Sequence, residues 1–186
     1  MTGRRIVLIG GGARSGKSTF ALVRARELGA RRLFVATARR YDAEMGERID
    51  RHIAERGGEF ETVEEPLAVA ETLLGAAGYD VAVVDCLTLW LSNLLLDGQP
   101  VDAIERRVEE LADALSRAPC HVVLVTNEVG MGLHPETPLG RTFRDVAGRA
   151  HQRLALAADE IHFAVLGLLL RLKPGPVPAR HPRDPS

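Results

Sequence analysis

The sequence predicts an α/β fold in which a mostly parallel sheet is covered by helices on both faces. Two observations lead to this prediction. Short apolar runs alternate with segments of helical periodicity along the chain, and this alternation is typical of βαβ units. A glycine-rich motif of the phosphate-binding type also lies between the first apolar run and the first helical segment, which is the context that such a motif requires.

Buried strands are predicted at five short runs of mostly apolar residues, because strands covered on both faces carry nearly continuous apolar runs. In chain order these are Ile6–Ile9, Leu33–Ala36, Val81–Val84, Val122–Val125 and Ile161–Val165. The first of them ends in glycines and is far too short for a signal peptide or a membrane span.

Helices are predicted between these strands. They are Ser18–Leu28, Asp42–Arg56, Pro66–Ala77, Val101–Arg117 and Thr142–Ala158. Asp42 suits an N-cap and Gly57 a helix stop, while Pro66 suits a first helical turn. The fourth segment places apolar residues at the i, i+3, i+4 spacing of an amphipathic helix.

A length of 186 residues fits one domain, which we assign to residues 1–173. Residues 174–186 contain five prolines and are predicted to be a flexible tail. The net charge of −1 gives no global field for nucleic acid or an anionic membrane, without excluding a local basic patch. Cys86 and Cys120 form no CxxC pair, so we expect reduced thiols in a cytoplasmic protein that binds no nucleic acid and inserts into no membrane.

The strongest motif matches G-x-x-x-x-G-K-[ST] in full. It consists of Gly11, Gly12, Ala13, Arg14, Ser15, Gly16, Lys17 and Ser18. Glycines let the backbone aim N–H groups at phosphate oxygens, and the following helix presents its positive end to the same anion. Lys17 is expected to neutralise the β- and γ-phosphates of a nucleoside triphosphate, and the Ser18 hydroxyl to bind Mg²⁺.

A second metal-binding group is expected at the end of the strand Val81–Val84. Asp85 follows this strand directly, so it should emerge at the carboxyl edge of the sheet beside the phosphate-binding loop. A carboxylate there would hold Mg²⁺ together with Ser18. The alternative is that Asp85 caps the next segment.

His52 lies between Arg48 and Arg56 on one face of the predicted helix Asp42–Arg56. Like charges on both sides disfavour the imidazolium form, and a neutral imidazole is a nucleophile. From the pattern alone, a surface histidine on a solvated charged helix is the better supported alternative.

Two further segments carry polar groups. The strand Val122–Val125 runs into a loop in which Glu128 could bind metal or position a hydroxyl, unless the loop is a plain turn. Arg144 and Arg149 could clamp phosphate, or could form ion pairs on the surface of their helix.

Five segments together resemble the bifunctional adenosylcobinamide kinase/adenosylcobinamide-phosphate guanylyltransferase family. They are Gly11–Ser18, Ala36-Thr37-Ala38, the stretch from Asp42 to His52, the segment from Asp85 to Leu95, and Val125–Gly132 followed by Phe143–Arg149. The order and spacing fit from about residue 6 to residue 173. Asp85 is Glu in some relatives, and the tail has no counterpart.

The resemblance implies two reactions. The first phosphorylates adenosylcobinamide with ATP or GTP, and the second transfers GMP from GTP to the product through a histidine. The family pattern R-I-x-x-H makes His52 the guanylylated residue, with Lys17 catalytic in both steps. The nucleotide-binding positions implied in addition to the phosphate-binding loop are Ala36, Thr37, Ala38, Ile53, Ala54, Glu55, Arg56, Glu64 and Asp85.

The resemblance also implies a P-loop fold of the RecA type and a homotrimer. Two other functions share the phosphate-binding loop. One is a small-molecule kinase without guanylyl transfer, which would give His52 no role. The other is a RecA-like nucleotide switch that responds to a macromolecular partner.

Overall fold

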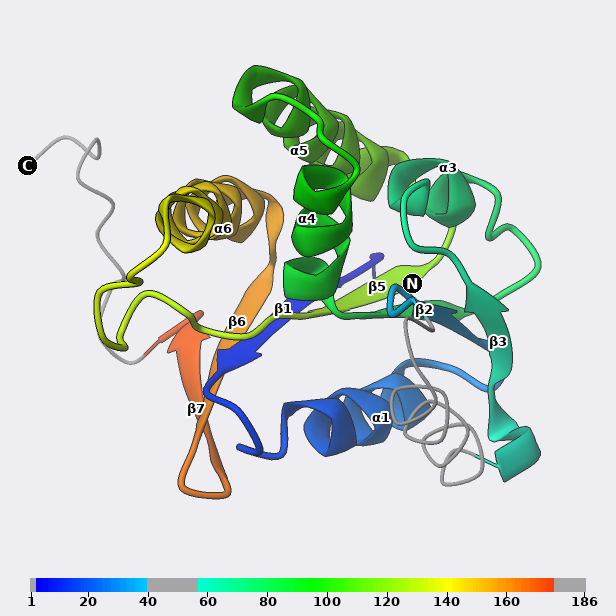
Figure 1. The fold of residues 1–186 in the computed structure, drawn as a ribbon. Coiled ribbons are helices and arrows are strands. Elements are labelled where there is room, and N and C mark those ends of the chain that lie inside the picture. Colours follow the sequence, from blue (N-terminus) through cyan, green and yellow to red (C-terminus); the bar gives the residue numbers. More distant parts are fainter. Residues whose placement is uncertain (1–2, 40–56, 176–186) are drawn as a thin grey trace, which may run out of the picture.

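A computed structural model describes residues 3–39 and 57–175 of the chain. Within them, seven strands form one sheet in the order β3-β2-β4-β5-β1-β6-β7 (Figure 1). The neighbouring pairs from β3 to β6 are parallel, and β7 runs antiparallel to β6. The mostly parallel sheet predicted from the sequence is confirmed.

The strands are β1 (Ile6–Gly11), β2 (Arg32–Ala36), β3 (Glu61–Glu64), β4 (Val81–Asp85), β5 (His121–Val125), β6 (Glu160–Val165) and β7 (Leu168–Lys173). The helices are α1 (Lys17–Leu28), the 3₁₀ turn η1 (Gly57–Glu59), α3 (Val69–Leu74), α4 (Leu87–Leu96), α5 (Val101–Arg117) and α6 (Pro138–Ala157).

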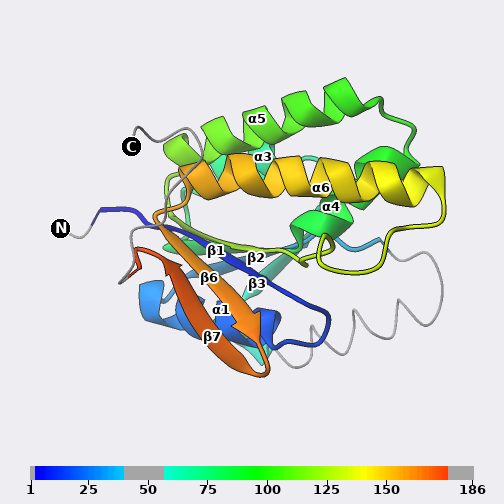
Figure 2. The ribbon, with the colours of Figure 1, turned by 90° about the vertical axis from the view of Figure 1, so that its left-hand side faces the viewer.

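The helices cover both faces of the sheet. Helix α1 lies on one face, while α3, α4, α5 and α6 lie on the other (Figures 1 and 2). Alternate residues of each central strand point to opposite faces. In β5, for example, Val122 and Leu124 join the core beneath the four helices, and Val123 and Val125 join the core beneath α1. This explains why the central strands are continuous apolar runs.

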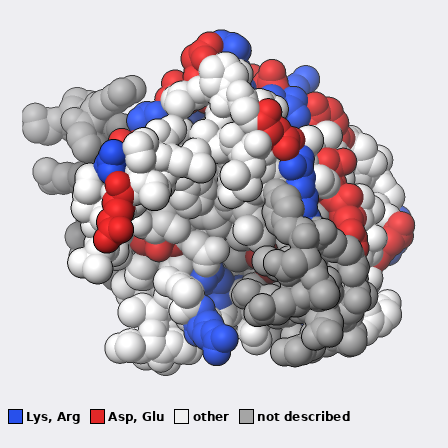
Figure 3. Space-filling view, viewed as in Figure 1, with Lys and Arg blue, Asp and Glu red and all other residues white. Residues whose placement is uncertain are grey.

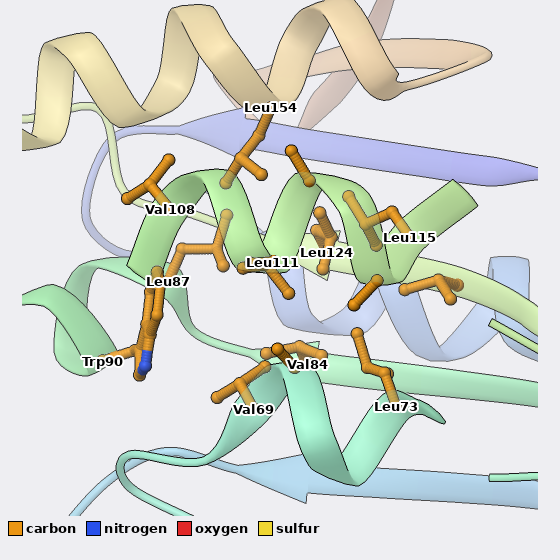
Figure 4. Close-up of a cluster of buried hydrophobic side chains, with 14 of the residues drawn as sticks. Val69, Leu73, Val84, Leu87, Trp90, Val108, Leu111, Leu115, Leu124 and Leu154 are labelled. Carbon is orange, nitrogen blue, oxygen red and sulfur yellow. The ribbon is translucent and has the colours of Figure 1, made fainter. Parts of the chain in front are cut away.

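The larger core lies between the sheet and helices α3 to α6 (Figure 4). Leu111 and Leu115 of α5 are buried against it, as the predicted periodicity requires. Trp90 of α4 is buried in the same core, and its indole N–H donates to the Leu67 carbonyl at 2.9 Å. Burial of the indole therefore leaves no unpaired polar atom on that ring.

Two predicted helices have other bounds in the structure. The predicted helix Pro66–Ala77 is only α3, because the Glu65 carboxylate accepts from the N–H groups of Leu67 and Ala68 and holds a turn there. Helix α6 begins earlier than predicted. Thr137 caps it by accepting from the Gly140 N–H at 3.1 Å, with Pro138 in the first turn.

Besides the 3₁₀ turn η1, three elements were not predicted. Helix α4 carries apolar side chains around most of its circumference, so it lacks the periodicity of an amphipathic helix. Strand β3 is a short edge strand with mostly polar side chains. Strand β7 returns along β6 through a turn at Leu166 and Gly167, both of which have positive φ.

Within residues 3–39 and 57–175, the structure has no helix of the length and apolarity that a membrane span requires.

Candidate functional site

The carboxyl ends of the parallel strands bring the predicted nucleotide-binding residues into one row. In the register of the sheet, Ala36 pairs with Glu64 on one side and with Asp85 on the other. Asp85 in turn pairs with Val125, which pairs with Ile9 at the end of the apolar part of β1. The phosphate-binding loop follows two residues later. Residues separated by more than 70 positions in the sequence thus share the edge where open α/β sheets bind ligands.

The phosphate-binding loop has the backbone that the motif predicts. Gly16 has φ 92°, a conformation that favours glycine, and it is the N-cap of α1. Gly11 is held against β6, where an added Cβ would lie 2.4 Å from the Ala164 carbonyl oxygen. The N-terminus of α1 therefore opens directly onto the loop and supplies the positive end of its dipole.

Lys17 is only 6% exposed. Its ammonium group donates to the Gly12 carbonyl at 2.6 Å and lies 3.4 Å from the Ser15 hydroxyl. Burial lowers the pKa of Lys17, and the nearby Asp85 carboxylate opposes this effect. A partly desolvated ammonium held over the loop is arranged to neutralise an anionic ligand.

The predicted pairing of Ser18 with Asp85 fits a hard divalent cation. Both side chains offer oxygen, the ligand atom that Mg²⁺ prefers. The charge of the Asp85 carboxylate acts on Lys17, raising the pKa of the ammonium group against the larger effect of burial. The N-cap position of α4 is Cys86 rather than Asp85, which disfavours the alternative of a capping role.

Thr37 ties the end of β2 to the end of β4. It is fully buried, its hydroxyl donates to the Cys86 carbonyl at 2.7 Å, and it accepts from the Cys86 N–H at 2.8 Å. The Asn93 amide of α4 donates to the Thr37 carbonyl at 2.8 Å. These contacts fix the backbone on either side of Asp85, so the Thr37 side chain shapes the site from within the core.

Glu128 lies beside the phosphate-binding loop. A pocket of about 560 Å³ is lined by residues 12–15, by Glu128 and Met131 from the loop after β5, and by residues 163–167 at the β6–β7 turn. The Glu128 N–H donates to the Gly11 carbonyl at 2.9 Å. The polar loop predicted after this strand therefore does reach the ligand-binding edge.

His151 of α6 stands behind Glu128. Its Nε2 lies 2.6 Å from the Thr126 hydroxyl, and its Nδ1 lies 4.0 Å from a Glu128 carboxylate oxygen. Burial lowers the pKa of His151, while the Glu128 carboxylate acts in the opposite direction. Burial thus favours the neutral imidazole, with one nitrogen facing Thr126 and the other facing Glu128.

The arginines of this region differ in their contacts. Arg149 pairs with Glu105 of α5 at 2.7 Å, which is the surface ion pair considered as its alternative role. Arg144 lies 3.1 Å from the His134 ring and 3.6 Å from Asp145. Arg14 of the phosphate-binding loop is exposed, and basic atoms are visible in Figure 3 where Figure 1 draws that turn.

The predicted helix Asp42–Arg56 lies outside the described residues. The predicted nucleophile and the four predicted nucleotide-binding residues after it are therefore not among the residues that the structure describes. They are His52, Ile53, Ala54, Glu55 and Arg56.

Sequence reasoning missed two contributors to this edge. Asn127 donates to the Thr88 hydroxyl at 3.0 Å and so joins the end of β5 to α4. His151 was also missed, although it shares a face of α6 with the buried Ala147 and Leu154. A polar residue within an apolar helical stripe was the available signal.

Comparison with known proteins gives a consistent family. The family model CobU, described as cobinamide kinase / cobinamide phosphate guanyltransferase, matches residues 7–172. The bifunctional adenosylcobalamin biosynthesis protein CobP of Pseudomonas aeruginosa is 44% identical over 91% of this chain and 98% of that protein. The corresponding proteins named CobU from Salmonella typhimurium and Escherichia coli are 40% and 38% identical, each over 90% of this chain and 99% of the relative.

Solved structures support the fold. The flagellar accessory protein FlaH from Methanocaldococcus jannaschii superposes with a TM-score of 0.51 at 10% identity, covering 91% of this chain and 78% of that one. A Pyrococcus horikoshii OT3 protein studied as PH0250 gives 0.55 at 8% identity, covering 91% and 86%. At such identities these likenesses concern the fold alone. Together with the phosphate-binding loop after β1 and the parallel order of the sheet, they confirm the predicted P-loop fold of the RecA type.

Proposed function

Because the chain belongs to the cobinamide kinase / cobinamide phosphate guanyltransferase family and is thereby a bifunctional enzyme of cobalamin biosynthesis, we propose that both of its reactions use one nucleotide site at the P-loop. In the first, the hydroxyl of adenosylcobinamide receives the γ-phosphate of ATP or GTP. In the second, GMP from GTP joins the new phosphate, which gives adenosylcobinamide-GDP. The observation that carries this proposal is geometric: Asp85 at the end of β4 is in register with Val125 and, through it, with Ile9 of β1, the strand that leads into the P-loop and Lys17.

In the kinase step, the loop N–H groups and Lys17 bind the triphosphate and stabilise the negative charge that develops on the transferred group. Ser18 and Asp85 would hold Mg²⁺, which would supply further charge neutralisation on the phosphates. Thr37 keeps the Asp85 segment in place through its two hydrogen bonds with Cys86. Ala36, Ala38 and Glu64 flank the same row and are proposed to contact the nucleotide.

In the guanylyl step, a ring nitrogen of His52 would attack the α-phosphorus of GTP and pyrophosphate would leave. The phosphate of adenosylcobinamide-phosphate would then attack the same phosphorus and free the histidine. Two displacements replace one difficult displacement. The pattern Arg48-Ile49-Asp50-Arg51-His52 supports this role, and residues 53–56 are proposed to contact the nucleotide beside it.

Intact-protein mass spectrometry after incubation with GTP and Mg²⁺ tests the covalent step. We expect the wild-type protein to gain the mass of one GMP and His52→Ala to gain none, while His52→Ala still phosphorylates adenosylcobinamide. His134→Ala is the matched control, because His134 is an exposed histidine in the loop between β5 and α6. It should acquire the adduct as the wild type does.

Two results would contradict this assignment. A wild-type protein that binds GTP and never acquires GMP would be a P-loop kinase without a histidine intermediate. Loss of kinase activity together with guanylyl transfer in a folded His52→Ala variant would contradict the separate roles of Lys17 and His52.

A homotrimer is proposed on the resemblance to the family. Strand β7 supports self-association, because it presents apolar side chains to solvent in the single chain. Leu168 is 70% exposed, Leu170 56% and Leu172 44%. Apolar surface of this kind is typical of an interface, and the mass of the protein in solution tests it.

A further inference from the structure

We propose that Glu128 is the general base of the kinase step and that His151, fixed by Thr126, is the positioning residue that orients it. This inference rests on the proposed function, because it takes the hydroxyl of adenosylcobinamide as the nucleophile. A hydroxyl must lose its proton as it attacks phosphorus, and neither Lys17 nor the oxygen ligands proposed for Mg²⁺ can accept that proton while they hold the nucleotide.

The position of Glu128 is fixed relative to the P-loop by backbone hydrogen bonds. The Thr126 N–H donates to the Ile9 carbonyl at 3.0 Å, and the Glu128 N–H donates to the Gly11 carbonyl at 2.9 Å. Gly11 is the first residue of the phosphate-binding motif. Glu128 therefore lines the pocket formed with residues 12–15 from a loop whose start is tied to β1 by backbone hydrogen bonds.

Two nitrogen groups lie beside the Glu128 carboxylate, one within hydrogen-bond distance and one farther away. One oxygen accepts from the Gly130 N–H at 2.6 Å, and the other faces His151 Nδ1 at 4.0 Å. The absence of a side chain at Gly130 leaves room for the Glu128 carboxylate. An added Cβ there would lie 2.9 Å from the oxygen that accepts from the Gly130 N–H. The Glu128 side chain is 27% exposed, so a substrate hydroxyl can reach it.

The surroundings favour proton transfer over metal binding. The nitrogen groups beside the two carboxylate oxygens are the Gly130 N–H, which donates a hydrogen bond, and His151 Nδ1 at 4.0 Å, and neither is an oxygen ligand. Of the two roles considered for Glu128 from the sequence, binding a metal or positioning a hydroxyl, the structure favours the second.

His151 has the arrangement of a positioning residue. Its Nε2 contacts the Thr126 hydroxyl at 2.6 Å, and Thr126 is itself buried at the end of β5. The proposed role assigns the Thr126 hydroxyl as the donor to Nε2, a tautomer that keeps the hydrogen on Nδ1, on the side of Glu128. The 4.0 Å separation exceeds a direct hydrogen bond, and such contacts commonly tighten when substrate binds.

The chemical step balances without another reactant. The substrate hydroxyl gives its proton to a Glu128 oxygen while its own oxygen bonds to the γ-phosphorus. The bond from that phosphorus to the β,γ-bridging oxygen breaks, and the nucleoside diphosphate leaves with the electron pair. Glu128 then releases the proton to water.

The two reactions of the enzyme provide an internal control. The guanylyl step uses a phosphate as the nucleophile, which carries no proton that must be removed. Glu128→Gln should therefore lower kcat for phosphorylation of adenosylcobinamide about 10²- to 10⁴-fold. Transfer of GMP to preformed adenosylcobinamide-phosphate should stay within about 3-fold of wild type.

Two histidine variants separate positioning from packing. In His151→Asn, the side-chain amide keeps an N–H group near the position of Nδ1. In His151→Gln, the amide lies near the position of Nε2 instead. His151→Asn should retain kinase kcat better than His151→Gln by about 10-fold, and both should spare guanylyl transfer.

Kinase kcat within 3-fold of wild type in Glu128→Gln, or an equal fall in both reactions, would overturn the role of Glu128. Equal kinase losses in the two His151 variants would overturn the positioning role. A wild-type protein that fails to phosphorylate adenosylcobinamide would instead refute the proposed function, so the two failures are distinguishable.

Discussion

The two edges of the same sheet use charged residues in opposite ways. At the amino edge, Arg5 and Arg24 both pair with Glu160, and Arg31 pairs with Asp80 at 2.7 Å. At the carboxyl edge, Lys17 is held by a carbonyl and lies near a hydroxyl. Figure 2 shows the turn from β1 to α1 at one end of the sheet and the start of the described chain at the other.

The pKa shifts follow the same division. At the amino edge, burial acts to raise the pKa of Glu160, but hydrogen bonds from Arg5 and His162 and the charge of Arg24 outweigh it, so the pKa lies below its usual value. At the carboxyl edge, burial lowers the pKa of Lys17 despite Asp85. The charged side chains at the amino edge stabilise one another within the chain. The partly desolvated ammonium group of Lys17 is instead arranged to bind an anionic ligand.

A pocket alone does not identify the site. A pocket of about 680 Å³ opens at the amino edge and is larger than the one of about 560 Å³ beside the P-loop. Its lining includes Arg5, Arg24 and Glu160, which already pair with one another. The charge of these residues is satisfied within the chain, so the smaller pocket is the better candidate for an anionic ligand.

Of the variants that compare the two edges, Lys17→Ala should have the largest effect, because it removes activity and leaves the fold intact. Lys17→Ala should lower both the kinase and the guanylyl reaction by about 10²- to 10³-fold, since both need the triphosphate held and neutralised. The nucleotide-free variant should be at least as resistant to heat as the wild type, because a buried ammonium costs desolvation energy. Steady-state kinetics and thermal unfolding measure the two effects.

Arg14→Ala is the matched control for Lys17→Ala, because Arg14 belongs to the same loop and is exposed. Its effect on either rate should be clearly smaller. An unimpaired second reaction in Lys17→Ala would contradict the single nucleotide site.

The second prediction tests whether one buried residue at the carboxyl edge, Thr37, contributes to both stability and activity. Thr37→Val keeps the side-chain shape and removes the hydroxyl that accepts from the Cys86 N–H. A buried N–H without an acceptor costs about 1–3 kcal/mol of unfolding free energy. Because Asp85 precedes Cys86, we also expect about 10-fold lower kcat at limiting Mg²⁺, a typical size for the loss of a group that orients a metal ligand.

Thr72→Val controls for the loss of a threonine hydroxyl. Thr72 donates to the Ala68 carbonyl within α3 and lies in no part of the candidate site. It should lose little stability and no activity. Stability loss without any change in Mg²⁺ dependence in Thr37→Val would limit Thr37 to a packing role.

Local sequence pattern predicted those parts of the fold in which one face of an element is apolar and the other polar, or in which a strand is apolar throughout. Helix α5 has the bounds that its periodicity predicts, with Leu111 and Leu115 in the core. Helix α4 was not predicted because it packs against the sheet and other helices and is apolar on most sides. Strand β7 was not predicted because its exposed leucines do not alternate with polar residues.

The site could be predicted where it depends on strand ends. The P-loop and Asp85 each follow an apolar run directly, and parallel strands bring such ends together whatever the details of packing. The approach of His151 to Glu128 depends on how α6 packs over β5, which no local pattern encodes. The role assigned to His52 stays a prediction.

The smallest expected effect lies at the amino edge and concerns stability alone. Asp80 accepts from the backbone N–H groups of Ala30 and Arg31 and pairs with the Arg31 side chain. Hydrogen bonds from the Arg31 side chain and backbone lower its pKa from 3.8 to about 2. A carboxyl with a depressed pKa in the folded state stabilises the protein above its unfolded pKa, and this contribution is lost as pH falls from about 3.8 towards about 2.

Asp80→Asn should therefore be less stable than the wild type at pH 7, and the difference should shrink between about pH 4 and pH 2. Urea unfolding of both proteins at several pH values measures this difference. Arg31→Gln should reproduce part of the loss, and the double variant should lose less than the sum, because the two side chains act as a pair. Since this pair lies at the edge opposite the P-loop, both reactions should keep wild-type rates at pH 7. A rate loss in folded Asp80→Asn would mean that the two edges are coupled, and a stability difference independent of pH would mean that the carboxylate charge does not stabilise this end of the sheet.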